Sequence, residues 1–264
     1  MTGKLRVAVH KFTSCDGCQL ALLNLGPALL AVAAQFEIVH FAEAGPVDLE
    51  APVDIALIEG SISTPDEEAR IARIRAGARY LIAIGACATS GGIQALRNLP
   101  HEGDWVGAIY ASPQYIESLA HVRSIRDVVK VDLELWGCPV TGAQVLAALR
   151  ALAFGVLPAN EGDKVCLECK RNQTVCVMVT HGVPCLGPVT RMGCGAICPR
   201  FGRDCYGCTG PAELPNTASF TRRLEGLGLP PRKAIQRIQF IHSAAPAFAA
   251  VAATTTTSQE HDGE

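Results

Sequence analysis

The chain has 264 residues, of which 49% are hydrophobic and 18% are charged, and its formal net charge is −2. The near-neutral charge and the aromatic content of 5% exclude a strongly basic nucleic-acid binder and a base-stacking platform. The hydrophobic share excludes global disorder and is sufficient for a sizeable core in one or two domains.

Residues 4–155 alternate short apolar runs with helical patterns. The expected strands are residues 5–9, 37–41, 54–58, 80–84 and 129–135. The expected helices are residues 19–34 with a break at Gly26-Pro27, residues 65–76 after a capping hydroxyl, and residues 140–152. This alternation predicts an α/β fold, with a parallel sheet buried by helices on both faces.

The rest of the chain has other patterns. Residues 99–128 are expected to form a surface insertion. Residues 160–210 are rich in Cys, Gly and Pro with little periodicity, so they need a cross-link or metal to hold them, and residues 215–242 are helical in pattern. The expected division is a first domain over 1–155, a cysteine-rich domain over 156–243 and a disordered tail over 244–264.

The expected compartment is the cytoplasm. The N-terminus enters a strand pattern at once, with no apolar run behind a basic start and no twin arginine, so no signal peptide is expected. No apolar stretch reaches the ~18 residues that a membrane span needs. Structural disulfides are disfavoured in the cytosol, so the 12 cysteines are interpreted mainly as metal ligands.

Four cysteines follow predicted strands. Cys15 and Cys18 follow the first strand, Cys87 the fourth and Cys138 the fifth. Because the carboxyl ends of parallel strands meet at one edge of a sheet, these thiols are expected to converge, and four thiolates are the usual complement of a [4Fe–4S] cluster. The alternative is a thioredoxin-like redox pair at Cys15 and Cys18, with unrelated cysteines elsewhere.

Glu59 also follows a predicted strand and is expected near the same edge. Two roles are weighed equally: capping of backbone amides, or movement of protons.

The other eight cysteines lie between positions 166 and 208. Eight thiolates match two four-thiolate sites, with iron–sulfur clusters favoured over zinc. A sequential partition is expected, although an interleaved one stays open. It assigns one site to Cys166, Cys169, Cys176 and Cys185, and the other to Cys194, Cys198, Cys205 and Cys208.

These motifs resemble a known family. Thr13-Ser-Cys-Asp-Gly-Cys-Gln-Leu, Ile58-Glu-Gly-Ser, Gly85-Ala-Cys-Ala and Gly137-Cys-Pro are similar to the small subunit of [NiFe] hydrogenases and to the complex I subunit that carries one cluster. Val165-Cys-Leu-Glu-Cys and Pro184-Cys-Leu-Gly-Pro-Val-Thr-Arg resemble the delta subunit of cytoplasmic sulfhydrogenases. The resemblance covers roughly residues 4–210, with all twelve cysteines in register.

The resemblance implies an electron-transfer subunit of an oxidoreductase that acts on hydrogen. It implies a flavodoxin-like domain holding a proximal cluster at Cys15, Cys18, Cys87 and Cys138, followed by a cysteine-rich iron–sulfur domain with C-terminal helices. Three [4Fe–4S] clusters would connect the Ni–Fe site of a large subunit with NAD(P)-linked flavin and iron–sulfur partner subunits. No catalytic residue would lie on this chain.

Two departures from the periplasmic members of the family are visible. Cys166 stands where they have a histidine ligand, and Ser14 stands where they have a glutamate before the first cluster cysteine. The proton path is therefore open, with Thr13, Ser14 and Glu59 as residues to test. The alternative functions are a complex I-type subunit with one cluster, disfavoured by the Cys15-x-x-Cys18 spacing, and a zinc-stapled interaction module.

Overall fold

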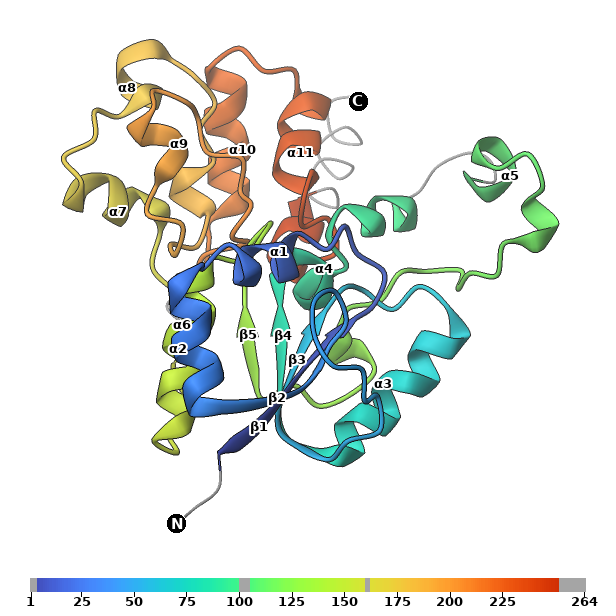
Figure 1. The fold of residues 1–264 in the computed structure, drawn as a ribbon. Helices are drawn as coiled ribbons and strands as arrows, with labels where there is room; N and C mark the ends of the chain where they lie inside the picture. The colour runs from blue at the N-terminus through green and yellow to red at the C-terminus, as the bar shows by residue number, and fades with distance from the viewer. Residues whose placement is uncertain (1–3, 100–104, 160–161, 252–264) are drawn as a thin grey trace.

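Five parallel strands form the sheet in the first half of the chain (Figure 1). The computed structural model describes residues 4–99, 105–159 and 162–251. The strands are β1 (Leu5–Lys11), β2 (Phe36–Phe41), β3 (Val53–Glu59), β4 (Ala78–Ile84) and β5 (Leu133–Leu135). Their order is β2-β1-β3-β4-β5, which is the flavodoxin-like order. The predicted α/β fold with a parallel sheet is confirmed.

The last strand is shorter than the sequence predicts. Just before β5, the Asp132 carboxylate accepts a hydrogen bond from the Leu81 backbone N–H at 2.8 Å and pairs with Arg75 at 2.6 Å. The Val129 N–H donates to the Ile125 carbonyl at 3.0 Å. Residues 129–132 therefore form a connection whose polar groups are satisfied locally, because side-chain and turn bonds replace the strand ladder.

Helices cover both faces of the sheet. They are α1 (Gly17–Leu23), α2 (Pro27–Gln35), α3 (Pro65–Gly77), α4 (Gly85–Ser90) and α6 (Gly142–Ala153). On one face α1 and α6 bury Leu22 and Leu149, and on the other face α3 buries Ile71 and Ile74. Full burial of such a side chain stabilises the folded state by about 1.5–3 kcal/mol. The two apolar cores therefore fix the helices on the sheet.

Two helix boundaries in this half agree with the sequence pattern. The predicted break falls between α1 and α2, with Pro27 in the first turn of α2. Helix α3 begins after Thr64, whose hydroxyl accepts from the Glu67 N–H while the Glu67 carboxylate accepts from the Thr64 N–H. This capping box satisfies two of the amides that a helix leaves unpaired.

Part of the segment between β4 and β5 projects from the body, and Figure 1 shows α5 extending away from the sheet. It contains η1 (Gly92–Asn98), α5 (Trp105–Ile109), η2 (Pro113–Tyr115) and η3 (Ile125–Asp127). Ile109 and Tyr115 are 66% and 82% exposed. The expected surface insertion is confirmed over residues 105–118, and residues 100–104 lie outside the described part.

Short helices make up the second half. They are α7 (Val165–Arg171), α8 (Val177–His181), η4 (Gly187–Val189), α9 (Ile197–Arg200), α10 (Thr217–Gly226) and α11 (Pro231–Gln239). The last two match the predicted helical stretch. The core here includes Cys185 and Cys205 together with Leu186 and Leu224, so cysteines replace part of the ordinary apolar core.

The sequence-based division places the start of the disordered tail, residue 244, too early. Phe248 and Val251 are each 1% exposed and belong to the same core as α10 and α11. The Gln239 side-chain amide donates to the Phe248 carbonyl at 3.2 Å. Residues 244–251 are therefore packed against this core. The sequence did not predict the packing because the segment is Ala-rich, with Phe248 as its aromatic residue. Residues 252–264 lie outside the described part.

No single described helix combines the length and apolar character needed to cross a membrane, and only the bent pair α1 and α2 passes that test jointly, by length and composition.

A pair of buried histidines joins β1 to β2. The rings of His10 and His40 stack at 4.6 Å between centroids, and the two residues are 3% and 2% exposed. Burial, then His40 and Arg70, lower the pKa of His10 to about 3, and burial and Arg70 lower the pKa of His40. Both rings are therefore neutral in the folded protein at neutral pH.

We expect His10→Phe to reduce the acid sensitivity of the fold. An unfolded histidine takes up a proton below pH 6.5, whereas folded His10 does not until about pH 3, so stability falls as the pH drops below 6.5. At pH 5.5 this costs roughly 1 kcal/mol for His10. Urea unfolding at pH 7.5 and 5.5 should show a smaller loss for the variant, and equal losses would contradict the assignment.

Candidate metal centres

The four N-terminal cysteines meet at the carboxyl edge of the sheet. Cys15 and Cys18 follow β1, Cys87 lies in α4 directly after β4, and Cys138 follows β5. Burial, together with nearby Cys138 and Cys15, raises the pKa of Cys87 to about 11 despite a bond to Gln94. Burial, then Glu59, Cys87 and Cys138, raise the pKa of Cys18 well above its usual value. The expected convergence of these thiols is therefore present.

Glu59 at the end of β3 holds the start of helix α1. It is 2% exposed, and its carboxylate accepts the Cys18 N–H at 2.8 Å and the Gln19 N–H at 3.3 Å. Asp16, the residue before the helix, makes no capping bond with its side chain. Glu59 thus has the amide-capping role that the sequence left open, and a role in proton movement stays a prediction.

Glycines leave space beside two of these sulfurs. A Cβ on Gly85, which has φ +84°, would lie 2.3 Å from the Cys18 Sγ, and one on Gly92, with φ +59°, would lie 2.8 Å from the Cys87 Sγ. Any side chain at either position would enter the volume next to the thiols. The Cys87 thiol donates to the side-chain oxygen Oε1 of Gln94 at 3.3 Å.

Thr13 and Ser14, two candidates for a proton path, form hydrogen bonds with residues at the starts of helices. The Thr13 hydroxyl donates to Glu67 at 2.9 Å, and the Glu67 carboxylate also accepts the Ser63 N–H at 2.8 Å. The Ser14 hydroxyl donates to the Asp16 carboxylate at 3.0 Å. Thr13 thus contacts the start of α3 and Ser14 contacts the residue before α1, and a role of either in proton movement stays a prediction.

The next four cysteines gather around α7 and α8. Burial raises the pKa of Cys169 to about 11, with further contributions from Cys166, Cys185 and Cys176. Burial and then Cys185 and Cys176 also raise the pKa of Cys166. These four thiols therefore lie near one another, and their assignment to one site stays a prediction.

The last four cysteines also lie near one another, as a second group that reaches Cys185. Burial, then Cys194 and Cys198, raise the pKa of Cys208 to about 12. Burial raises the pKa of Cys205 as well, with contributions from both Cys185 and Cys208. The Cys205 N–H donates to the Cys185 Sγ at 3.2 Å, so the two groups touch at this pair.

Glu168, inside the Cys-Leu-Glu-Cys motif, orders the loop that carries Cys194. Its carboxylate accepts the N–H groups of Gly193, Gly195 and Ala196 at 3.0, 2.9 and 3.2 Å. Three amide bonds to one carboxylate fix a glycine-rich turn that has little packing of its own. Sequence reasoning missed this role, and its only signal was the position of the carboxylate within the motif.

His242 joins the two halves of the molecule. The fully buried ring has Nδ1 2.7 Å from the Ser90 Oγ in α4 and Nε2 2.9 Å from the Cys208 carbonyl oxygen, and it packs on Trp136 at 5.4 Å between centroids. Burial lowers the pKa of His242 to about 4. Nothing in the sequence marked this histidine, because its partners lie 34 and 152 residues away.

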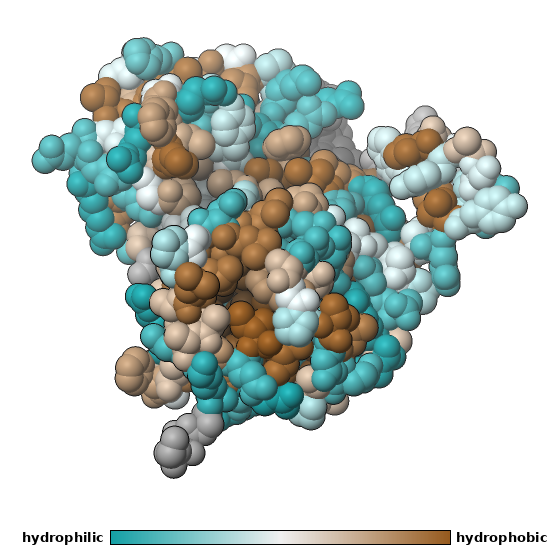
Figure 2. All heavy atoms as spheres, viewed as in Figure 1, coloured by the Kyte–Doolittle hydropathy of each residue, from teal (hydrophilic) through white to brown (hydrophobic). Residues whose placement is uncertain are grey.

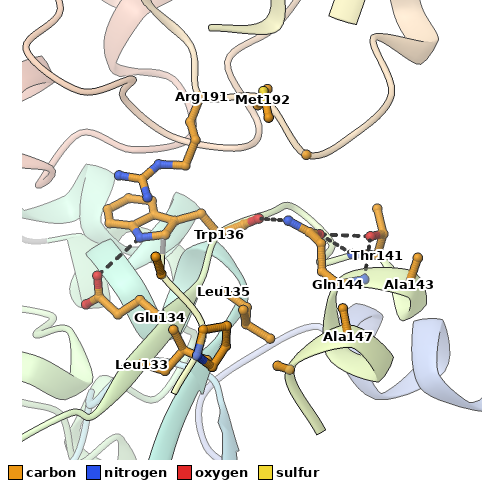
Figure 3. Close-up of a pocket in the computed structure, with 14 residues that line it drawn as sticks. Leu133, Glu134, Leu135, Trp136, Thr141, Ala143, Gln144, Ala147, Arg191 and Met192 are labelled. Atoms are coloured by element: carbon orange, nitrogen blue, oxygen red, sulfur yellow. Dashed lines mark hydrogen bonds between the residues drawn. The ribbon is translucent and has the colours of Figure 1, made fainter. Parts of the chain in front are cut away.

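Trp136 forms the rest of the joint (Figure 3). Its indole N–H donates to the buried Glu134 at 3.1 Å, and the Arg191 guanidinium lies 5.1 Å from its ring. Arg126 pairs with the other Glu134 oxygen at 2.7 Å. The Gly137-Cys138 turn directly follows Trp136, so this polar and aromatic contact positions Cys138 against the second half.

The twelve thiols fit iron–sulfur ligation by three observations. All are free of disulfides, several are buried with raised pKa values, and glycine gaps and backbone amides face their sulfurs. A thiolate in such a setting needs a cation beside it, which a metal supplies. Within the described ranges, no three His, Cys, Asp or Glu side chains are placed to hold a single metal ion.

Comparisons with known proteins agree on one family. The model described as NADH ubiquinone oxidoreductase, 20 Kd subunit, matches residues 15–152. Sulfhydrogenase 2 subunit delta of Pyrococcus furiosus is 35% identical over 79% of this chain and 87% of that protein. A vhu subunit of the F420-non-reducing hydrogenase of Methanocaldococcus jannaschii is 32% identical over 81% of this chain and 84% of that protein.

One solved structure extends the agreement to three dimensions. The NAD+-reducing [NiFe]-hydrogenase in the H2-reduced state matches with a TM-score of 0.54 and 28% identity, over 60% of this chain and 95% of that chain. The resemblance stated from the cysteine motifs is thereby confirmed. The chain belongs to the NADH ubiquinone oxidoreductase 20 kDa subunit family, among the hydrogenase small subunits.

Proposed function

We propose that this chain is the electron-transfer small subunit of a cytoplasmic [NiFe] hydrogenase. It would carry electrons between the Ni–Fe site of a large subunit and an NAD(P)-linked flavin and iron–sulfur partner. The observation that carries the proposal is contact between successive cysteine groups. The Cys138 backbone interacts with the Cys208 thiol, and the Cys205 N–H donates to the Cys185 Sγ.

Three [4Fe–4S] clusters would be held by the three groups of four thiols. The first group is Cys15, Cys18, Cys87 and Cys138. The second, by contact, is Cys194, Cys198, Cys205 and Cys208, and the third is Cys166, Cys169, Cys176 and Cys185. Clusters held there would supply one-electron redox chemistry. We keep the division near residue 155 between the sheet domain and the cysteine-rich domain.

The large subunit is proposed to dock on the face that presents Cys15. Cys15 is the exposed member of the first group, and Leu20 in α1 is 50% exposed beside it in sequence. A pocket of about 450 Å³ lined by Ile93, Trp105 and Ile109 continues this face toward α5. Figure 2 shows apolar surface on the projecting α5 segment. Apolar groups of this kind favour burial by a partner.

The proposal of an NAD(P)-linked partner is supported by similar proteins. A solved relative is an NAD+-reducing hydrogenase, which supports an NAD(P)-linked partner. That relative matches only 60% of this chain, whereas the Pyrococcus sulfhydrogenase subunit matches 79%. We therefore propose that electrons leave through the cysteine-rich half and enter separate flavin and iron–sulfur subunits.

Replacing Cys87 tests the first group. We expect Cys87→Ser in the assembled complex to abolish hydrogen-dependent reduction of NAD(P) or dye, because one sulfur ligand of the group nearest the large subunit is lost. The assay compares the variant with Phe154→Ser, whose side chain is 86% exposed directly after α6. Full coupled activity in Cys87→Ser would refute the assignment.

The glycine gap gives a structural test. In Gly85→Ala the new methyl group would lie 2.3 Å from the Cys18 Sγ, in a backbone with φ +84°. We expect the variant to lose about a third of its iron, the share of one cluster in three. Gly77→Ala is the matched control, because a Cβ at Gly77 meets nothing within 4 Å. Unchanged iron in Gly85→Ala would show that no group occupies this edge.

A further inference from the structure

Cys208 links the second group of thiols to the first. The backbone of Cys138 forms a hydrogen bond with the Cys208 thiol, a contact that by itself favours the thiolate. An N–H donated to a cluster sulfur raises the reduction potential of the cluster, because it stabilises the negative charge added on reduction. An electron step from the first group to the second therefore depends on where Cys208 lies relative to Cys138.

The turn that carries Cys208 packs against Trp136. The Gly210 N–H donates to the Gly207 carbonyl at 3.0 Å, which closes the turn. Gly210 has φ +77°, and a Cβ at this position would overlap the Trp136 ring. The indole N–H is held by Glu134 at 3.1 Å. The indole ring thus supports one side of the turn, and the Cys208 carbonyl needs a second group to fix its direction.

His242 holds this carbonyl. A carbonyl oxygen only accepts hydrogen bonds, so Nε2, which lies 2.9 Å from the Cys208 oxygen, carries the ring proton. Because burial keeps the ring neutral, Nδ1 accepts from the Ser90 hydroxyl at 2.7 Å. Ser90 lies one turn after Cys87 in α4, which Figure 1 shows at the end of β4. The bond from His242 to Cys208 is therefore directed from the helix that carries a cysteine of the first group.

We propose that His242 is a positioning residue for the electron step between the first and second groups. Its Nε2–H holds the Cys208 carbonyl so that the Cys208 sulfur stays within reach of the Cys138 N–H. This inference rests on the proposed function, because it takes both groups to hold clusters. In the step, one electron leaves the reduced first cluster and reduces the oxidised second cluster, with no bond or proton transferred.

Three substitutions separate the two hydrogen bonds of the ring. His242→Gln places an amide N–H near the position of Nε2 and keeps the bond to Cys208, whereas His242→Asn places its amide near Nδ1 and keeps only the bond to Ser90. His242→Phe keeps an aromatic ring and loses both bonds. Ser243→Ala is the matched control, because Ser243 is 3% exposed and its hydroxyl has no hydrogen-bond partner among the described residues.

The measurement is a redox titration of the purified complex, followed by electron paramagnetic resonance, with iron per chain as the check on assembly. The signal of the second cluster is identified as the one that Cys208→Ser alters. In His242→Asn and His242→Phe we expect this cluster to be about tenfold harder to reduce, which is a midpoint about 59 mV lower for a one-electron couple. His242→Gln and Ser243→Ala should keep the equilibrium within about twofold of the wild type, because both keep the bond to Cys208.

A second readout separates positioning from general damage. Isotope exchange between H2 and D2O at the large subunit needs no electron to pass through this chain. We therefore expect the exchange rate to stay at the wild-type value in the three His242 variants and in Ser243→Ala.

Several outcomes would overturn the inference. They are a wild-type midpoint in iron-replete His242→Asn or His242→Phe, a shift in His242→Gln as large as that in His242→Asn, or an equal shift in Ser243→Ala. Loss of iron in both His242→Asn and His242→Phe, or loss of isotope exchange together with the shift, would make His242 a purely structural residue and would also overturn it. The proposed function fails on a different result, a wild-type chain with no iron and no reducible centre.

Discussion

The structure depends on one constraint. Several thiols are buried where a thiolate is stable only beside a cation. Cys18 and Cys205 lie within apolar cores and have raised pKa values. A buried thiolate without a partner would cost several kcal/mol. The glycine gaps at Gly85 and Gly92, and the amide aimed at the Cys185 sulfur, provide space and hydrogen bonds where iron would offset that cost.

The two halves of the molecule meet where two cysteine groups meet. Trp136 and Glu134 precede Cys138, and His242 connects α4, which carries Cys87, to the Cys208 carbonyl. The first and second groups of cysteines are therefore held relative to each other by the same contacts that hold the halves together. A neutral buried ring suits this place, because it adds hydrogen bonds without adding a charge.

The sequence predicted what depends on local pattern and strand order. Apolar runs gave the parallel sheet, and cysteines after strand ends gave the convergence at its edge. What depends on distant partners could not be predicted. Strand β5 begins only after residues 129–132 because Asp132 bonds to Leu81, and Phe248 is buried against helices that its own Ala-rich segment does not indicate. Glu168 and His242 are important only through partners the fold brings to them.

The central claim is that the twelve thiols hold three clusters that accept electrons. Iron and acid-labile sulfide per chain, together with the electrons taken up in an anaerobic reductive titration, test it most directly. The account predicts about twelve iron, about twelve sulfide and about three electrons. A colourless protein that carries zinc, or one with substantially less iron and no reducible paramagnetic centre, would contradict it.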